Sequence, residues 1–250
     1  MKPITPLPHR ITGIRETPID LQEDFLTFAG RFARMPGTVL LMSGGDLDCA
    51  RHHILAVRPW LTLRGRGERL AVTWEAGETL ITGNPFDALE GILDRFRVET
   101  APTDTPIAAG LLGYLAYDLT DAIEELPRTA VDDLCLPHLH LIAPSLIVTR
   151  ETATGRTRLF LPEGAGFSDD GDGNRHAWFE EIASGPPPRT GAFEGNRHGF
   201  CANFTRPEYM EAVDRIKSYI GAGDVYQVNL SQRFVRSEEH TSELQSRQVI

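Results

Sequence analysis

The sequence predicts an α+β protein built on antiparallel β-sheets. Its strand and helix patterns lack the regular strand–helix–strand alternation that produces a parallel sheet. Two pairs of apolar runs are joined by short glycine turns, near residues 65–67 and 154–155, which is typical of β-hairpins. The strands between residues 38 and 161 are therefore expected to pair in antiparallel sheets.

The first hundred residues predict two helices with strands between them. Over 21–34 the apolar side chains recur at steps of four, three and four, which places them on one helix face, and Pro36-Gly37 ends the helix. These side chains are Leu21, Phe25, Phe28 and Phe32. Strands are predicted at 38–42 and 51–57, with a hairpin at 60–74. The second amphipathic helix is marked by Phe86, Leu89, Leu93 and Phe96.

The middle of the chain predicts further strands. Residues 107–117 are strongly apolar and contain Gly110 and Gly113, which indicates a bend or a close backbone approach within a strand. A hairpin is expected from 139–149 and 157–161. A short helix over 177–182 then precedes three consecutive prolines, which form a stiff linker.

The last strong element is a helix over residues 206–220. Thr205 and Glu208 form a capping-box pattern at its start, and Gly221-Ala-Gly223 closes it. The following residues, 225–235, alternate apolar and polar side chains, which predicts a strand at the boundary of a core.

Charge and composition exclude several classes of protein. A net charge of −10, with arginines scattered along the chain, disfavours a nucleic-acid binder or a membrane-surface protein. No run of 18 apolar residues predicts a membrane span, and residues 1–14 do not form a secretory signal. The three cysteines, Cys49, Cys135 and Cys201, are too far apart for a disulfide framework or a zinc knuckle. We therefore expect a cytoplasmic protein.

Candidate chemistry is sparse when the residues are taken alone. His138 and His140 alternate on a predicted strand and point the same way, but no third ligand lies nearby, so packing or surface histidines are favoured over a metal pair. The acidic run Asp118, Asp121, Glu124 and Glu125 is typical of a solvated turn, although it could also help to dock a partner. No nucleophile–histidine–carboxylate pattern stands out.

One stretch carries a specific resemblance. Residues 208–234, and above all Gly223-Asp-Val-Tyr-Gln-Val-Asn-Leu-Ser231, resemble the helix and strand that open the catalytic domain of chorismate-utilising enzymes. Upstream, Gly110–Leu119 and Glu125–Pro127 are similar to the glycine-rich strand and acidic turn of the same family. Thr120-Asp121 replaces the basic residue that often follows that strand. The resemblance spans about residues 20–235.

Two details of the resemblance favour one branch of the family. Val228-Asn229-Leu230 is similar to aminodeoxychorismate synthase (para-aminobenzoate synthase) component I rather than to anthranilate synthase component I. Met42 stands where anthranilate synthases usually have a glutamate. The resemblance implies a two-sheet, sandwich-like core with flanking helices. It also implies amination of chorismate for folate biosynthesis, with Mg²⁺ and with ammonia from a glutamine amidotransferase subunit.

The resemblance divides the chain into three parts. Residues 1–190 correspond to the family's N-terminal domain, and 191–235 begin the chorismate-binding domain. Residues 236–250 resemble the translation of a sequencing adapter and are expected to be foreign to the family. The family's catalytic, chorismate-binding and magnesium-binding residues would lie beyond position 235, so no catalytic or metal-binding residue is predicted here and the fragment is expected to be inactive.

Leu40–Ser43 and Arg51-His52 resemble the family's amino-acid pocket. The resemblance implies a tryptophan site formed by Ser43, Cys49, Ala50, Arg51 and His52. Serine can donate to a carboxylate and arginine can bind one through two nitrogens, so Ser43 and Arg51 are expected to lie close together. The alternative is that Ser43 ends a strand and Arg51 is a surface cation. Binding is expected to be weak, because the family's downstream Pro-Phe segment is missing.

Two other functions remain open on the sequence. The chain could be a fragment of anthranilate synthase component I, which belongs to tryptophan biosynthesis. It could also be a non-catalytic module that senses an amino acid or docks a partner. A reading frame that continues past codon 235 with family motifs would favour an enzyme, whereas a natural stop codon would favour the module.

Overall fold

The computed structural model describes residues 10–45, 47–75, 77–98, 104–126, 131–165, 175–188 and 199–236. The chain divides into two compact units, Met1–Arg189 and Thr190–Ile250. None of the helices in the described ranges has the length and apolar character needed to cross a membrane. Of the adapter-like residues 236–250, those from 237 onward lie outside the described part, as does Pro127 of the predicted acidic turn.

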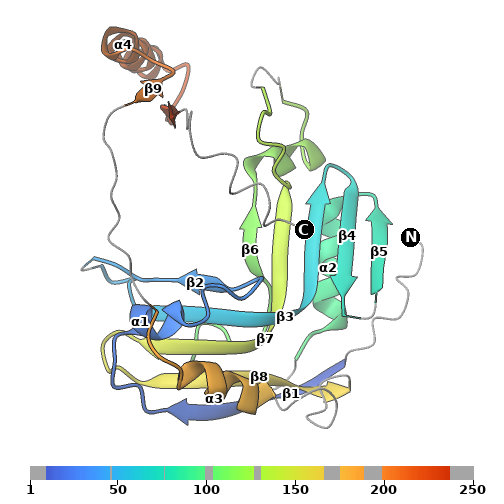
Figure 1. Ribbon diagram of the computed structural model, residues 1–250. Coiled ribbons are helices and arrows are strands. Elements are labelled where there is room, and N and C mark those ends of the chain that lie inside the picture. The colour runs from blue at the N-terminus through green and yellow to red at the C-terminus, as the bar shows by residue number, and fades with distance from the viewer. Residues whose placement is uncertain are drawn as a thin grey trace. The chain divides into compact units, whose positions relative to one another are not determined.

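The first unit is built on an antiparallel sheet of eight strands (Figure 1). The main strand order is β1-β8-β7-β3-β4-β5, while β2 pairs with β3 and β6 pairs with β7. The strands are β1 (Arg10–Ile19), β2 (Val39–Leu41), β3 (His52–Arg66), β4 (Arg69–Trp74), β5 (Gly77–Thr82), β6 (Leu112–Leu115), β7 (Leu139–Glu151) and β8 (Thr157–Ala165). This arrangement confirms the predicted α+β class with antiparallel strands and flanking helices.

The sheet bends where its two longest strands, β3 and β7, pass from one half to the other (Figure 1). Pro59 pairs with Pro144, and Leu61 then pairs with Ala143, so Trp60 is an extra residue that forms a β-bulge. Arg58 beside it has a positive φ of 52°. The layers expected to form two sheets are therefore two halves of one bent sheet.

The first half of the sheet consists of β1, β2, β8 and the paired segments 52–57 of β3 and 146–151 of β7. Helices α1 (Phe25–Gly30) and α3 (Arg175–Ala183) cover one of its faces. Phe25, Phe28 and Phe32 are buried, and they pack with Phe179 of α3 against alternate residues of β3, β7 and β8. Asp24 caps α1 by accepting a hydrogen bond from the amide of Thr27 at 2.8 Å. The aromatic face predicted for 21–34 is confirmed, but the regular helix is shorter than expected.

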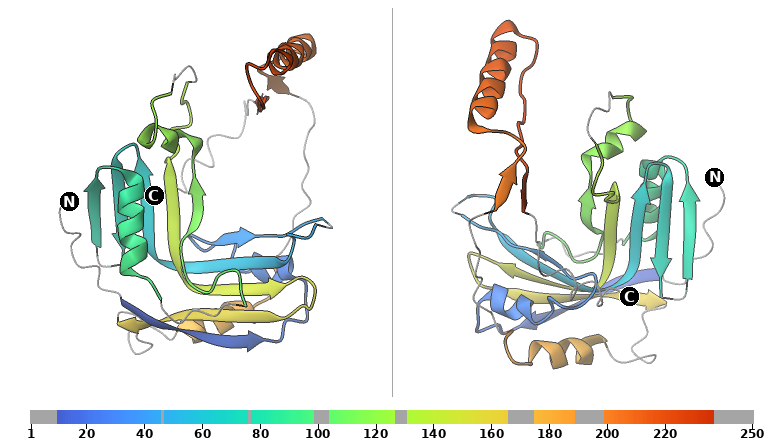
Figure 2. Two further views of the ribbon diagram at one scale, coloured as in Figure 1. Left: turned by 180° about the vertical axis from the view of Figure 1, so that it is seen from behind. Right: turned by 45° about the horizontal axis from the view of Figure 1, so that its top comes forward.

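Helix α2 (Pro85–Arg95) packs on the other half, against β3, β4 and β5, and lies in front of these strands in the left view of Figure 2. Ile92 is its most buried side chain, with 1% of its surface exposed, whereas Leu93 is 50% exposed. Phe86, Leu89 and Phe96 of the predicted apolar face do pack on this core, but Ile92 takes the place expected for Leu93. A third buried cluster, on the opposite face of the first half from α1, joins Ala56, Ile147 and Phe160 to Ala108 and Leu112.

The predicted strand over 107–117 is shorter in the structure, because only Leu112–Leu115 pair with β7. Gly113 has a φ of 149°, and a Cβ atom there would lie 2.0 Å from the carbonyl oxygen of His140. The close backbone approach expected from the glycines is confirmed at this position. A short 3-10 helix, η1 (Tyr117–Ala122), follows β6.

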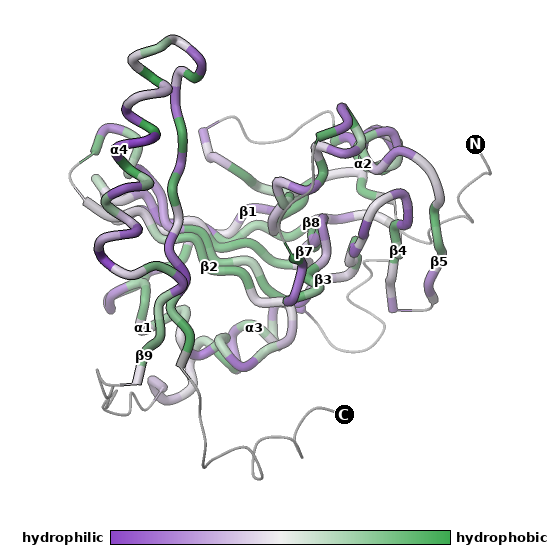
Figure 3. Tube along the Cα trace, turned by 90° about the horizontal axis from the view of Figure 1, so that it is seen from above, coloured by the Kyte–Doolittle hydropathy of each residue, from purple (hydrophilic) through white to green (hydrophobic). Residues whose placement is uncertain are grey.

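The second unit contains α4 (Arg206–Ala222) and the strand pair β9 (Phe200–Ala202) and β10 (Phe234–Arg236). The capping box is confirmed, since Thr205 and Glu208 exchange side-chain-to-backbone hydrogen bonds and Gly223 ends the helix with a φ of 82°. Helix α4 buries none of its residues and is largely hydrophilic (Figure 3).

The prediction of a strand over residues 225–235 was wrong. The chain forms no regular structure from 225 to 233, and pairing begins only at Phe234. A strand needs a neighbour to satisfy its backbone groups, and the neighbour in the described residues is the three-residue β9. Accordingly, Tyr226 is 96% exposed on the side that the alternation assigned to a core.

Candidate functional site

Ser43 lies against the first residues of β3. Its hydroxyl donates to the carbonyl of His52 at 2.7 Å, and its amide donates to Nδ1 of His53 at 3.1 Å. These bonds continue the pairing of β2 with β3 beyond Leu41. The structure thus brings together Ser43 and His52 of the predicted amino-acid pocket.

Arg51 makes different contacts from Ser43. Its Nε donates to the carbonyl of Asp48 at 2.6 Å, within the loop before β3, and its side chain is exposed. The carbonyls of Ala50 and Arg51 both accept from the hydroxyl of Thr152, which ties this loop to the end of β7. Cys49 is exposed in the same loop. Ser43 and Arg51 thus both find hydrogen-bond partners within the protein, without a ligand. The tryptophan pocket stays a prediction.

His53 belongs to this corner and was not among the predicted pocket residues. Its ring stacks on Phe25, with 5.5 Å between the ring centroids. Burial lowers the pKa of His53, and the nearby charge of Arg150 lowers it further. Because Nδ1 accepts from Ser43, the neutral ring carries its proton on Nε2. The alternation of side chains along a strand could have identified His53 from the sequence, since only one of His52 and His53 can face inward.

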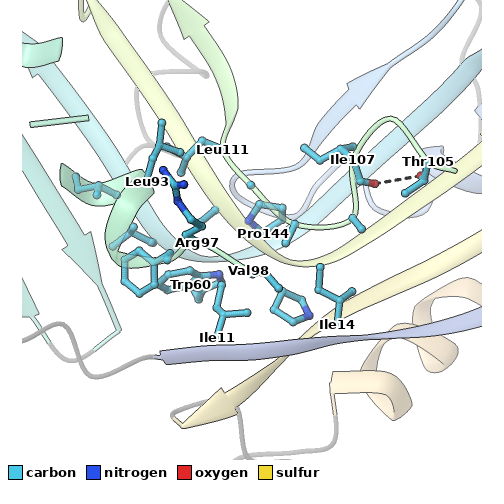
Figure 4. Close-up of a pocket in the computed structure, with 18 of the residues that line it drawn as sticks. Ile11, Ile14, Trp60, Leu93, Arg97, Val98, Thr105, Ile107, Leu111 and Pro144 are labelled. Carbon is cyan, nitrogen blue, oxygen red and sulfur yellow. Dashed lines mark hydrogen bonds between the residues drawn. The ribbon is translucent and has the colours of Figure 1, made fainter. Parts of the chain in front are cut away.

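A pocket of about 470 Å³ lies beside the bend of the sheet (Figure 4). Its walls come from β1, β3, β7, β8, the end of α2 and the segment 105–111. The apolar lining includes Ile11, Ile14, Trp60, Leu93, Ile107, Leu111 and Pro144. None of the predicted tryptophan-site residues lines this pocket. Sequence reasoning missed it because its walls come from elements far apart in the chain.

The wall formed by 105–111 is anchored by ion pairs at Asp104. Nη1 of Arg158 lies 2.9 Å from one carboxylate oxygen of Asp104, and Nη2 of Arg156 lies 2.8 Å from the other. Arg158 is only 5% exposed and also pairs with Glu16 of β1 at 3.2 Å. Hydrogen bonds from Arg158 and then Arg156 lower the pKa of Asp104. One buried guanidinium therefore holds β1, β8 and the start of this wall together.

His138 and His140 act as packing residues. His138 is buried and its Nδ1 accepts from the amide of Gly67 at 3.4 Å, while the ring of His140 meets Tyr114 edge-on at 6.0 Å. His138 also lines a second pocket of about 180 Å³ with Asp118 and Asp121. Within the described ranges, no three His, Cys, Asp or Glu side chains could together hold a metal ion.

Comparisons with known proteins agree on one family. The profile of the chorismate binding enzymes matches residues 57–246. Aminodeoxychorismate synthase component 1 of Escherichia coli is 30% identical, over 83% of this chain and 44% of its own length. Anthranilate synthase component 1 of Thermus thermophilus is 32% identical, over 90% of this chain and 47% of its own length. The chain therefore spans less than half the length of these curated relatives.

A solved structure supports the fold. The crystal structure of anthranilate synthase component I from Streptococcus pneumoniae matches with a TM-score of 0.54 at 20% identity, over 76% of this chain and 43% of that one. The likeness extends the sequence match to the three-dimensional arrangement of the strands. The chain belongs to the chorismate-binding enzyme family.

Proposed function

We propose that this chain is the N-terminal part of aminodeoxychorismate synthase component I, which aminates chorismate to 4-amino-4-deoxychorismate. The proposal rests above all on Gly223–Ser231, the stretch that follows α4. Its first residue adopts the left-handed conformation that ends the helix, so the motif begins at a position where glycine is structurally required. Val228-Asn229-Leu230 and Met42 favour this branch over anthranilate synthase.

The reaction groups are proposed to lie in a C-terminal part that this chain does not contain. The described residues do not fit a magnesium site, because they offer no group of three suitable ligands. In the proposed enzyme, the remainder of the chorismate-binding domain would hold Mg²⁺, and a glutamine amidotransferase subunit would deliver ammonia. The proposed role of the first unit is to provide a rigid support and an amino-acid-binding corner at Ser43.

The experiment compares two proteins under the same conditions. Chorismate, ammonium and Mg²⁺ are given to the purified chain and to the full reading frame that continues past Val235. We expect no turnover by the chain alone and 4-amino-4-deoxychorismate from the longer protein, identified by chromatography and mass spectrometry. Anthranilate as the product would assign the sister enzyme instead. Turnover by the chain alone would contradict the placement of the reaction groups.

A non-catalytic module is the second candidate. The observation that favours it is that all three buried clusters of the described chain belong to the first unit, which has its own core. A natural stop codon close after codon 235, together with stable expression of the chain, would favour this function over the enzyme.

A further inference from the structure

We propose that the pocket of about 470 Å³ beside the sheet bend binds a small apolar or aromatic monoanion, and that Arg97 pairs with the anionic group at the mouth. This ligand differs from the amino acid expected at Ser43. The proposal concerns the first unit alone and does not depend on the activity of the longer protein.

The size and lining of the pocket suit a small organic molecule. Pockets that bind such ligands measure roughly 300–1,000 Å³ and are mainly apolar, with a few polar groups that set orientation. Here Trp60 and Phe96 meet edge-on, with 5.0 Å between their ring centroids, and both line the pocket. Ile11, Ile14 and Pro144 add further apolar surface to the lining (Figure 4). Filling the pocket would remove this apolar surface from water.

The charge of the lining selects the class of ligand. Among the described residues that line the pocket, Arg97 is the only charged one, and none is acidic. An α-amino acid would leave its ammonium group without a carboxylate partner there, which is unfavourable. A carboxylate or sulfonate without an amino group matches the single guanidinium.

Arg97 is well placed to bind an anion, although its guanidinium already pairs with Asp94. Its side chain is 76% exposed at the end of α2, and its Nη2 lies 2.7 Å from Oδ1 of Asp94. An arriving anion can share or replace this exposed ion pair, which is worth little by itself. Asp94 does not line the pocket, so it lowers the affinity for an anion without blocking entry.

The opposite wall is pre-formed. Asp104 is fixed by Arg156 and the buried Arg158, and Thr105 donates its hydroxyl to the carbonyl of Ile107 at 3.3 Å. Ala108 is buried in the third cluster and fixes the middle of the segment. A pocket held open in this way needs little ordering when a ligand binds.

The test uses two probes of equal shape, 2-naphthoate and neutral 2-naphthamide, titrated into the chain by calorimetry. We expect 2-naphthoate to bind more tightly. Arg97→Gln should weaken 2-naphthoate binding by about threefold to fivefold, the size of an exposed ion pair, and leave 2-naphthamide unchanged. Asp94→Asn should tighten 2-naphthoate binding about twofold. Arg95→Gln is the matched control, because it removes the same charge from a residue that does not line the pocket.

A filling variant tests the location. Ala109→Phe, on the wall segment, should abolish binding of both probes while the melting temperature and circular dichroism spectrum stay those of the parent. Unchanged 2-naphthoate binding in a folded Ala109→Phe variant would overturn the proposal. If that variant does not fold, the surface variants decide: equal effects of Arg97→Gln and Arg95→Gln, or competition by L-tryptophan with similar affinity, would overturn it.

Discussion

Gly113 is a residue at which the backbone leaves no room for any side chain. Its φ of 149° is rarely adopted by other residues, and an added Cβ would meet the carbonyl of His140 in the neighbouring strand. We expect Gly113→Ala to lower the free energy of unfolding by about 1–3 kcal/mol through backbone strain, with the clash adding to it. Urea denaturation measures the loss.

The control for Gly113 lies in helix α2. Gly91 has an ordinary helical conformation and open space around its Cβ position. Gly91→Ala should therefore raise stability by about 0.5–1 kcal/mol. If both alanine variants changed stability in the same direction, the argument from local geometry would be wrong.

Asp104 makes stability depend on pH in the acid range. Hydrogen bonds from Arg158 and Arg156 lower its pKa in the folded chain, so the unfolded chain binds the proton more readily. This contribution is fully present above the unfolded pKa, about 3.9, and is lost as the pH falls through the lowered folded value. Asp104→Asn should be less stable than the parent at pH 7, and the difference should shrink below about pH 4.

Thermal melts between pH 2.5 and 7 measure this dependence. Asp94→Asn is the matched control, because Asp94 pairs with the exposed Arg97, whereas Asp104 pairs with a buried arginine. A constant stability difference between Asp104→Asn and the parent across this range would show that the carboxylate charge is not responsible.

At the scale of elements, α1 is attached to the sheet through its aromatic side chains. Phe32, just after the helix, is completely buried and its ring stacks on Phe179 of α3 at 5.4 Å. Phe32→Ala should cost about 3–5 kcal/mol, because the cavity it leaves is enclosed by two helices and the sheet. Leu26 lies on the outer side of α1 and is 58% exposed, so Leu26→Ala should cost less than about 1 kcal/mol. Chemical denaturation of the two variants tests this contrast.

The elements that could be predicted are those whose pattern is local. The phenylalanine spacing of α1 and the capping box of α4 are both present in the structure. Strand β1 escaped prediction because a bulge between Ile11 and Gly13 interrupts its alternation. Residues 225–233 had the alternation of a strand but lack the neighbours that would make them one. Local pattern is necessary for a strand, whereas pairing depends on distant parts of the chain.

The candidate sites follow the same physical rule. Ser43 could be singled out by resemblance, but its bonds to His52 and His53 depend on how β2 pairs with β3. The larger pocket could not be predicted, because it brings β1 beside the end of α2 and a loop at 105–111. The ligand proposed for it would pair with Arg97, whose spacing from Asp94 is that of an ordinary surface ion pair.

At the scale of the whole molecule, stability is concentrated in the first unit. Every buried apolar residue of the described chain lies between Phe25 and Phe179, whereas α4 buries none of its residues. A helix without a packed face is marginally stable, because propensity and caps alone contribute little. We therefore expect the shortened chain 1–189 to melt within about 2 °C of the full chain, since a shift of about 2–4 °C would correspond to roughly 1 kcal/mol in a domain of this size.

Hydrogen exchange in the full chain provides the second readout for this prediction. Amides in the middle of β3 and β7, where both strands are paired on each side, should exchange only on global unfolding. Amides of α4 should exchange orders of magnitude faster, and an extended chain that continues the chorismate-binding domain should protect them by burying their apolar face. Slow exchange in α4 of the present chain, or a melting temperature that falls by more than about 5 °C on removal of residues 190–250, would show that the second unit contributes to the stability of the first.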